Sequence, residues 1–161
     1  MNTTIALDST ELNQTKDELE KLIREFVAIE NELLSRGRVE RNFTAGLATF
    51  LSSHYKNGDI IVDAFYNRHG MLSKKIGNKL IEADIVIHQQ GIDDNNLVII
   101  ELETNNHPER DDIWKLEEMT QTFYGYQYKL GLYFAVGVGN RAGEILSLEW
   151  YKNGKIIKEE K

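Results

Sequence analysis

The sequence ADIVIHQQGIDDNNLVIIELE, residues 83–103, decides the fold. Two runs rich in β-branched residues, 82–88 and 96–103, are bounded by glycine, asparagine and aspartate, a pattern typical of consecutive strands. Side chains of a strand alternate between the two faces of a sheet, so Asp84 shares a face with Val86 and His88. For the same reason, Glu101 and Glu103 project together from the next strand.

Further runs on either side predict the rest of a sheet. Residues 59–66 (DIIVDAFY) predict a strand before this segment, and residues 130–138 (LGLYFAVGV) predict a buried central strand after it. Residues 145–151 and 155–157 flank Asn153-Gly154, which predicts a closing hairpin with a type I′ turn.

Three segments have helical periodicity instead. Residues 9–36 carry apolar side chains at three- and four-residue spacings, which predicts one long amphipathic helix ending near Gly37. Residues 39–55 and 109–124 predict two more helices, the last beginning after Pro108. The 161 residues therefore predict one α/β domain, 1–161, with the helix 9–36 at one end and the hairpin 145–159 at the other.

Composition excludes several classes of protein. The chain has no cysteine, so disulfides and thiolate metal sites are excluded. No apolar run approaches the roughly 20 residues that a membrane span needs, and the polar start lacks the features of a signal peptide. These features favour a protein of a reducing, cytoplasmic compartment without a membrane partner.

The charge is unevenly distributed. The net charge is −7, but the first 35 residues hold eight acids and three bases, so the rest of the chain is close to neutral. The stretch from Arg68 to Lys79 carries no acid and contains four bases, which favours contact with phosphates and hence a nucleic-acid partner. These candidate nucleic-acid-binding residues are Arg68, Lys74, Lys75 and Lys79.

Four acids form a candidate site. Asp84 and the pair Glu101 and Glu103 can meet across neighbouring strands, where opposed Cβ atoms are about 5 Å apart. Helical spacing places Glu40 on the stripe of Phe43, and therefore on the buried side of its helix. Two carboxylates 4 Å apart repel by about 4 kcal/mol at an effective dielectric of about 20. Such a cluster protonates, disperses into water or binds a divalent cation, for which oxygen ligands favour Mg²⁺, Mn²⁺ or Ca²⁺.

The motif Ala83-Asp84-Ile85-Val86-Ile87-His88, followed by Leu97-Val98-Ile99-Ile100-Glu101-Leu102-Glu103, resembles the core of the PD-(D/E)XK nuclease superfamily. The resemblance covers roughly residues 38–138 and includes a segment common in bacterial members, Asp112-Ile113-Trp114-Lys115-Leu116. It implies a restriction endonuclease-like αβββαβ core with a mixed central sheet. By resemblance, Asp84, Glu101 and the Leu102 carbonyl would hold Mg²⁺ or Mn²⁺, and Glu40 would assist.

Two positions depart from the family motif. Ala83 replaces a proline that contributes only backbone shape, whereas Glu103 stands where the family has lysine. Three alternatives remain open. Glu103 orients or deprotonates the attacking water, the lysine has moved to Lys115 on the following helix, or catalysis is lost and the fold is kept for binding.

The expected function is hydrolysis of phosphodiester bonds by a divalent-metal-dependent DNA endonuclease. In this interpretation Glu103, Lys115 and Glu40 are catalytic, and Asp84, Glu101 and Leu102 bind the metal. The alternative is a catalytically degenerate nuclease-fold module that binds nucleic acid or protein. The apolar stripe of residues 9–36 packs either on its own domain or on a second copy in a homodimer.

Overall fold

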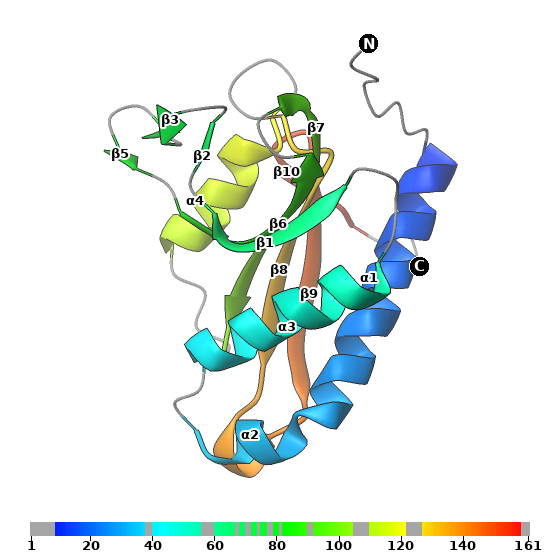
Figure 1. Ribbon diagram of the computed structural model, residues 1–161, viewed down its shortest axis with the longest axis vertical. Helices are drawn as coiled ribbons and strands as arrows, with labels where there is room; N and C mark the ends of the chain where they lie inside the picture. The colour runs from blue at the N-terminus through cyan, green and yellow to red at the C-terminus, as the bar shows by residue number, and fades with distance from the viewer. Residues whose placement is uncertain are drawn as a thin grey trace.

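A six-stranded mixed sheet with helices on both faces forms the body of this computed structural model (Figure 1). The structure describes residues 9–37, 40–55, 60–66, 68–69, 72–73, 75–76, 79–80, 82–89, 92–104, 110–121 and 127–158. The helices are α1 (Ser9–Ile29), α2 (Asn31–Ser35), α3 (Glu40–His54), α4 (Arg110–Met119) and the short 3₁₀ helix η1 (Gly139–Arg141). The strands of the sheet are β1 (Ile61–Tyr66), β6 (Ala83–Gln89), β7 (Ile92–Glu103), β8 (Leu130–Val136), β9 (Ile145–Lys152) and β10 (Lys155–Ile156).

The sheet has the order β1-β6-β7-β8-β9-β10. All neighbouring strands are antiparallel except β7 and β8, which run parallel, with Glu101 beside Tyr133 in their register. A parallel pair needs a crossover connection, and here the connection contains α4. The expectation of an α/β fold with a mixed central sheet is therefore confirmed at this level.

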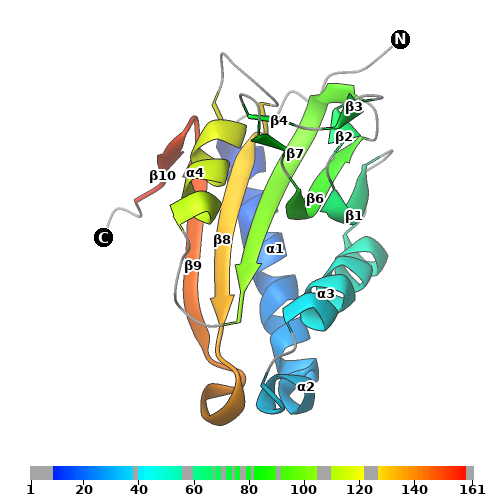
Figure 2. The ribbon, with the colours of Figure 1, turned by 90° about the vertical axis from the view of Figure 1, so that its left-hand side faces the viewer.

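The two faces of the sheet carry different helices, as Figure 2 shows with α4 in front of the sheet and α1 behind it. The larger apolar cluster joins α1 and α3 to one face and includes Phe43, Leu47 and Phe134, all fully buried. A smaller cluster joins Leu116 and Met119 of α4 to the other face. Strand alternation holds along the centre of β6 and β7: Ile85, Ile87, Val98 and Ile100 belong to the larger cluster, and Val86 and Ile99 to the smaller one.

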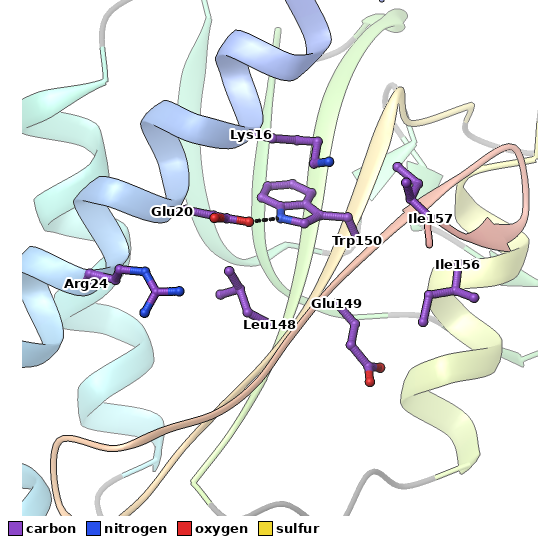
Figure 3. A pocket seen from close by; sticks show the side chains of 8 residues that line it. All are labelled: Lys16, Glu20, Arg24, Leu148, Glu149, Trp150, Ile156 and Ile157. Carbon is purple, nitrogen blue, oxygen red and sulfur yellow. Dashed lines mark hydrogen bonds between the residues drawn. The ribbon is translucent and has the colours of Figure 1, made fainter. Parts of the chain in front are cut away.

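Helix α1 is held on the sheet by its apolar stripe and by one polar anchor. Leu19 and Ile23 are fully buried, and Trp150 of β9 donates its indole N–H to Glu20 Oε1 at 2.7 Å (Figure 3). Of the two predicted locations for this stripe, packing on its own domain is the one observed. The expected single helix over 9–36 is wrong at its end: a break at Glu30 separates α1 from α2 and leaves Ile29 63% exposed.

Other boundaries differ by a few residues. β7 begins at Ile92 rather than at 96, and α4 ends at Met119 rather than at 124. The segment between β1 and β6 contains two short antiparallel strand pairs: β2 (Arg68–His69) with β3 (Leu72–Ser73), and β4 (Lys75–Ile76) with β5 (Lys79–Leu80).

Two local features agree closely with the sequence. Asn153 and Gly154, with φ of 53° and 78°, form the turn between β9 and β10, as the type I′ expectation requires. Gly131 of β8 lies under α4, and a Cβ atom at this position would lie 3.0 Å from Thr120 Cγ2 and 3.2 Å from Leu116 Cδ2. The missing side chain thus lets α4 approach the sheet closely. None of the helices in the described ranges is long and apolar enough to cross a membrane.

Candidate catalytic site

Asp84 and Glu101 face each other across the β6–β7 ladder. The register pairs Ile85 with Ile100, so the next two residues outward are Asp84 and Glu101, on the face covered by α4. A side-chain hydrogen bond joins the two carboxyl groups. Asp84 Oδ2 also accepts the N–H of Leu102 at 2.9 Å. The structure therefore brings together the two acids that the strand pattern places on one face.

Burial makes this pair hard to ionise. Glu101 is only 1% exposed, and Asp84 is partly buried. Burial, followed by repulsion from Asp84, raises the pKa of Glu101 well above its usual range. Burial also raises the pKa of Asp84, although the Leu102 N–H and the hydrogen bond with Glu101 oppose this shift. The pair therefore favours a shared proton or a bound cation.

Lys115 of α4 supplies a positive charge to this pair. Its Nζ lies 3.1 Å from Glu101 Oε1 and 3.9 Å from Asp112 Oδ1, and it donates to the carbonyl of Glu82 at 3.1 Å. Burial alone would lower the pKa of Lys115, but attraction to Glu101 and Asp112 outweighs it and raises the pKa. The ammonium group is therefore charged and lies beside the carboxyl pair, although it comes from a helix.

Glu101 Oε1 is buried but accepts no hydrogen bond from the residues that the structure describes. The nearby Lys115 ammonium makes an ion pair with this oxygen, but the orientation is not that of a hydrogen bond. The ion pair with Lys115 offsets part of the cost of burying this oxygen, although no hydrogen bond of regular geometry reaches it from the described residues. This oxygen has the chemistry of a ligand for a hard cation.

Glu103 interacts with the neighbouring strand. Its Oε2 accepts the hydroxyl of Tyr133 at 3.4 Å. Burial, and then the charge of Glu103, raise the pKa of Tyr133, so the phenol stays protonated and can donate. Leu102 lies between the two glutamates with its side chain in the core on the opposite face. Glu103 thus lies at the end of β7, on the α4 face.

Glu40 is not on the buried side of its helix, contrary to expectation. It is the first residue of α3 and is exposed, and its Oε2 accepts the N–H and the hydroxyl of Thr104 at 3.3 Å and 3.2 Å. The stripe of Phe43 and Leu47 is correctly predicted, but its first position falls at the helix end, beyond the packed part of the helix. Within the described part of the chain, the contacts of Glu40 tie α3 to the end of β7.

The basic stretch can be placed only in part. Arg68, Lys75 and Lys79 lie on β2, β4 and β5, but their side chains, and all of Lys74, fall outside the described residues. Their expected contact with phosphate therefore stays a prediction.

Sequence reasoning missed some of the residues around the pair. Asp112, named in the sequence only as part of the segment 112–116, contributes to the electrostatics of the carboxyl pair. Tyr133 lies within an apolar run, where the sequence gives it no distinct signal. The parallel register of β7 and β8 brings it to Glu103, and no local sequence pattern predicts that register. His88, which shares the face of Asp84, has its Nε2 2.9 Å from Asp63 Oδ2 of β1.

The donor set fits a hard cation only in part. Asp84 and Glu101 offer carboxylate oxygens, of which Glu101 Oε1 is paired with Lys115, but no group of three or more Asp, Glu or His side chains within the described ranges converges to hold a metal ion. The third carboxylate, Glu103, is engaged by Tyr133 instead. Comparisons of the sequence with protein-family models and with curated proteins found no match.

A recess lies between α1 and β9, on the face of the sheet opposite to Asp84 and Glu101 (Figure 3). It has a volume of about 280 Å³ and is lined by charged residues of α1, including Lys16 and Arg24, and by Leu148 and Ile156. Lys16 Nζ lies 6.0 Å from the ring centre of Trp150. Because the sheet separates this recess from Asp84 and Glu101, it is not part of the carboxyl site.

Proposed function

We propose that this protein is a divalent-cation-dependent DNA endonuclease with a restriction endonuclease-like fold. The observation that carries the proposal is the juxtaposition of Asp84, Glu101 and Lys115, in which a buried Glu101 oxygen lies 3.1 Å from the Lys115 ammonium group and beside the Asp84 carboxylate. Acids on two adjacent strands together with a lysine resemble the residue set of the PD-(D/E)XK nuclease superfamily, which hydrolyses phosphodiester bonds.

The residues divide the chemical work as follows. Asp84, Glu101 and the Leu102 carbonyl would hold Mg²⁺ or Mn²⁺. When bound, this cation polarises a phosphate oxygen and lowers the pKa of a coordinated water. Lys115 places its charge where negative charge develops on the phosphate during the reaction. Glu103, steadied by Tyr133, orients the attacking water or accepts its proton.

The position of Lys115 supports the alternative in which the lysine has moved. Its Nζ reaches the carboxyl pair from α4, so a positive charge is available even though Glu103 occupies the family's lysine position. Glu40 has a positioning role in this scheme, because its bonds to Thr104 hold the end of β7, where Glu103 is located.

One observation favours a second candidate, a catalytically degenerate module that binds nucleic acid or protein. Lys115 is held by Glu101, Asp112 and the Glu82 carbonyl, and these contacts are also those of a lysine that only neutralises buried acids. In that case the fold binds DNA without cutting it.

Cleavage of supercoiled plasmid with Mg²⁺ or Mn²⁺ distinguishes the two candidates. We expect Asp84→Asn and Glu101→Gln to reduce nicking at least 100-fold, while Glu144→Gln, in the exposed Arg141–Glu144 pair, leaves it unchanged. Parallel gel-shift measurements show whether each variant still binds DNA. Nicking that survives both substitutions would refute the site, and DNA binding by a wild-type protein that never cuts would support the second candidate.

A further inference from the structure

A second carboxylate-bearing pair lies on the same face of the sheet as Asp84. Asp63 of β1 pairs with Val86 of β6, and Val86 belongs to the cluster under α4. The Oδ2 atom of Asp63 lies 2.9 Å from Nε2 of His88, and His88 is 1% exposed. Asp84 and His88 lie two residues before and two residues after Val86 along β6, so all three side chains are on the same face of the sheet.

Asp63 is close to the carboxyl pair but does not belong to it. Residues offset by two across a ladder are about 7–8 Å apart. This separation agrees with the finding that Asp63, Asp84 and Glu101 do not converge as one metal-binding group within the described ranges. The Asp63 side chain is 34% exposed, and it also borders a hollow between α3 and β1. Its carboxylate therefore remains accessible to a hydrated cation.

Phe65 does not cover the space between these acids. The β1–β6 register places Phe65 opposite Asp84, where a regular strand would put its ring on the same face. Phe65 instead has φ of 54°, which is unusual for a bulky residue, and its ring lies 3.9 Å below the guanidinium of Arg41 of α3. The ring is thus drawn toward α3, away from Asp84.

We infer that Asp63 is a further cation-attracting carboxylate of the Asp84–Glu101 site, acting at a distance of about 8 Å, and that His88 is the residue that positions it. The inference rests on the proposed function, because it takes the Asp84–Glu101 pair as the place where the cation is held. A divalent ion about 8 Å from a carboxylate in water gains about fivefold in affinity from Coulomb attraction. His88 contributes by fixing the carboxylate from the buried side.

The test measures Mn²⁺ affinity by calorimetry on the full chain without DNA. At low salt we expect Asp63→Asn to weaken Mn²⁺ binding about fivefold, and this loss should shrink below twofold in about 0.5 M salt because screening removes it. Glu144→Gln removes the same charge near η1 and serves as the matched control. An effect of Asp63→Asn no larger than that of this control would overturn the inference.

Variants of His88 test the positioning role. His88→Leu removes the donor but leaves the charge of Asp63, so it should weaken Mn²⁺ binding by less than Asp63→Asn does, whereas His88→Gln keeps an N–H near the same place and should restore most of the affinity. Equal losses in both His88 variants would contradict positioning. If His88→Leu does not fold, two results still test the inference. His88→Gln should bind Mn²⁺ nearly as well as the wild type, and Asp63→Asn should bind it more weakly.

Asp84→Asn separates this inference from the proposed function. If Asp84→Asn leaves Mn²⁺ affinity unchanged, the proposed site itself fails. If Asp84→Asn abolishes binding while Asp63→Asn behaves like the Glu144→Gln control, only the role of Asp63 fails.

Discussion

The two faces of the sheet are built from the same strands but have different chemistry. Under α1 and α3, β6 and β7 contribute Ile85, Ile100 and Leu102 to an apolar core. Under α4, the alternate positions hold Asp84 and Glu101, with Lys115 above them. The larger face therefore provides stability, and the smaller one places ionisable groups where water is largely excluded.

The largest expected effect is on the stability of the apolar face. Phe43 is fully buried, with its ring 5.1 Å from that of Phe26 and 6.4 Å from that of Phe134. We expect Phe43→Ala to lower the free energy of unfolding by about 4 kcal/mol, because it removes a large side chain and leaves a cavity. Urea denaturation measures this loss. Tyr133→Phe, which removes only a hydroxyl on the other face, should cost about 1 kcal/mol, and equal costs would contradict the comparison.

Divalent cations should stabilise only through the α4 face. At a Mn²⁺ concentration 100 times its dissociation constant, the free energy of unfolding should rise by about 2.7 kcal/mol, since a ligand that binds only the folded state must stabilise it. Thermal melts in Mn²⁺ and in EDTA measure this shift. The shift should vanish in Asp84→Asn and persist in Glu144→Gln. Coincident melts of the wild-type protein in Mn²⁺ and EDTA would count against the cation site.

Loss of Lys115 should destabilise the metal-free protein in a pH-dependent way. Lys115→Ala leaves Glu101 buried without its ion-pair partner, which we expect to cost about 2 kcal/mol at pH 8. At pH 5 the cost should be smaller, because the raised pKa of Glu101 leaves more of this carboxyl group protonated at lower pH. Lys152→Ala, on β9, is the matched control and should have little effect at either pH. Equal losses at the two pH values would indicate that Lys115 acts by packing alone.

The most gradual effect is the pH dependence of the wild-type protein without metal. The folded-state pKa of Glu101 lies well above its ordinary value of 4.5, and that of Asp84 is raised too. Between 4.5 and the raised pKa, the folded state holds a proton that the unfolded chain has released. Stability is therefore fully present below about pH 4.5 and falls as the pH rises through this window, by up to about 1.4 kcal/mol per pH unit for each group.

Glu101→Gln checks the origin of this pH dependence. The variant cannot ionise at this position, so its stability should vary less with pH than that of the wild type, when urea unfolding is measured in EDTA from pH 4 to 8. An unchanged slope would show that the dependence arises elsewhere.

Local rules predicted much of the scaffold. Alternation along 83–88 and 97–103 placed Asp84 and Glu101 on one face, and Asn153-Gly154 marked the last turn. Strand alternation and the turn both depend on residues close in sequence, whose geometry is fixed by the backbone itself. The break at Glu30 was missed because the apolar spacing continues through it.

The surroundings of the site depended on contacts that the sequence does not encode locally. The hydrogen bond between Tyr133 and Glu103 follows from a parallel register across a long connection. Asp63 and His88, which also pair, are 25 residues apart in the sequence. Glu40 was misplaced because helical spacing gives a residue's angle around the axis but not whether that turn is covered. The nuclease resemblance itself stays a prediction.

The close approach of α4 at Gly131 has a mechanical consequence for Lys115. The backbone of a lysine on β7 would be held by the hydrogen bonds of the sheet. The position of the Lys115 ammonium depends instead on how α4 packs on β8. A single methyl group at residue 131 would press on Leu116, the immediate neighbour of Lys115 in the chain. A small displacement of this helix thus changes the distance between the Lys115 ammonium and Glu101, so the ion pair depends on an entirely nonpolar position.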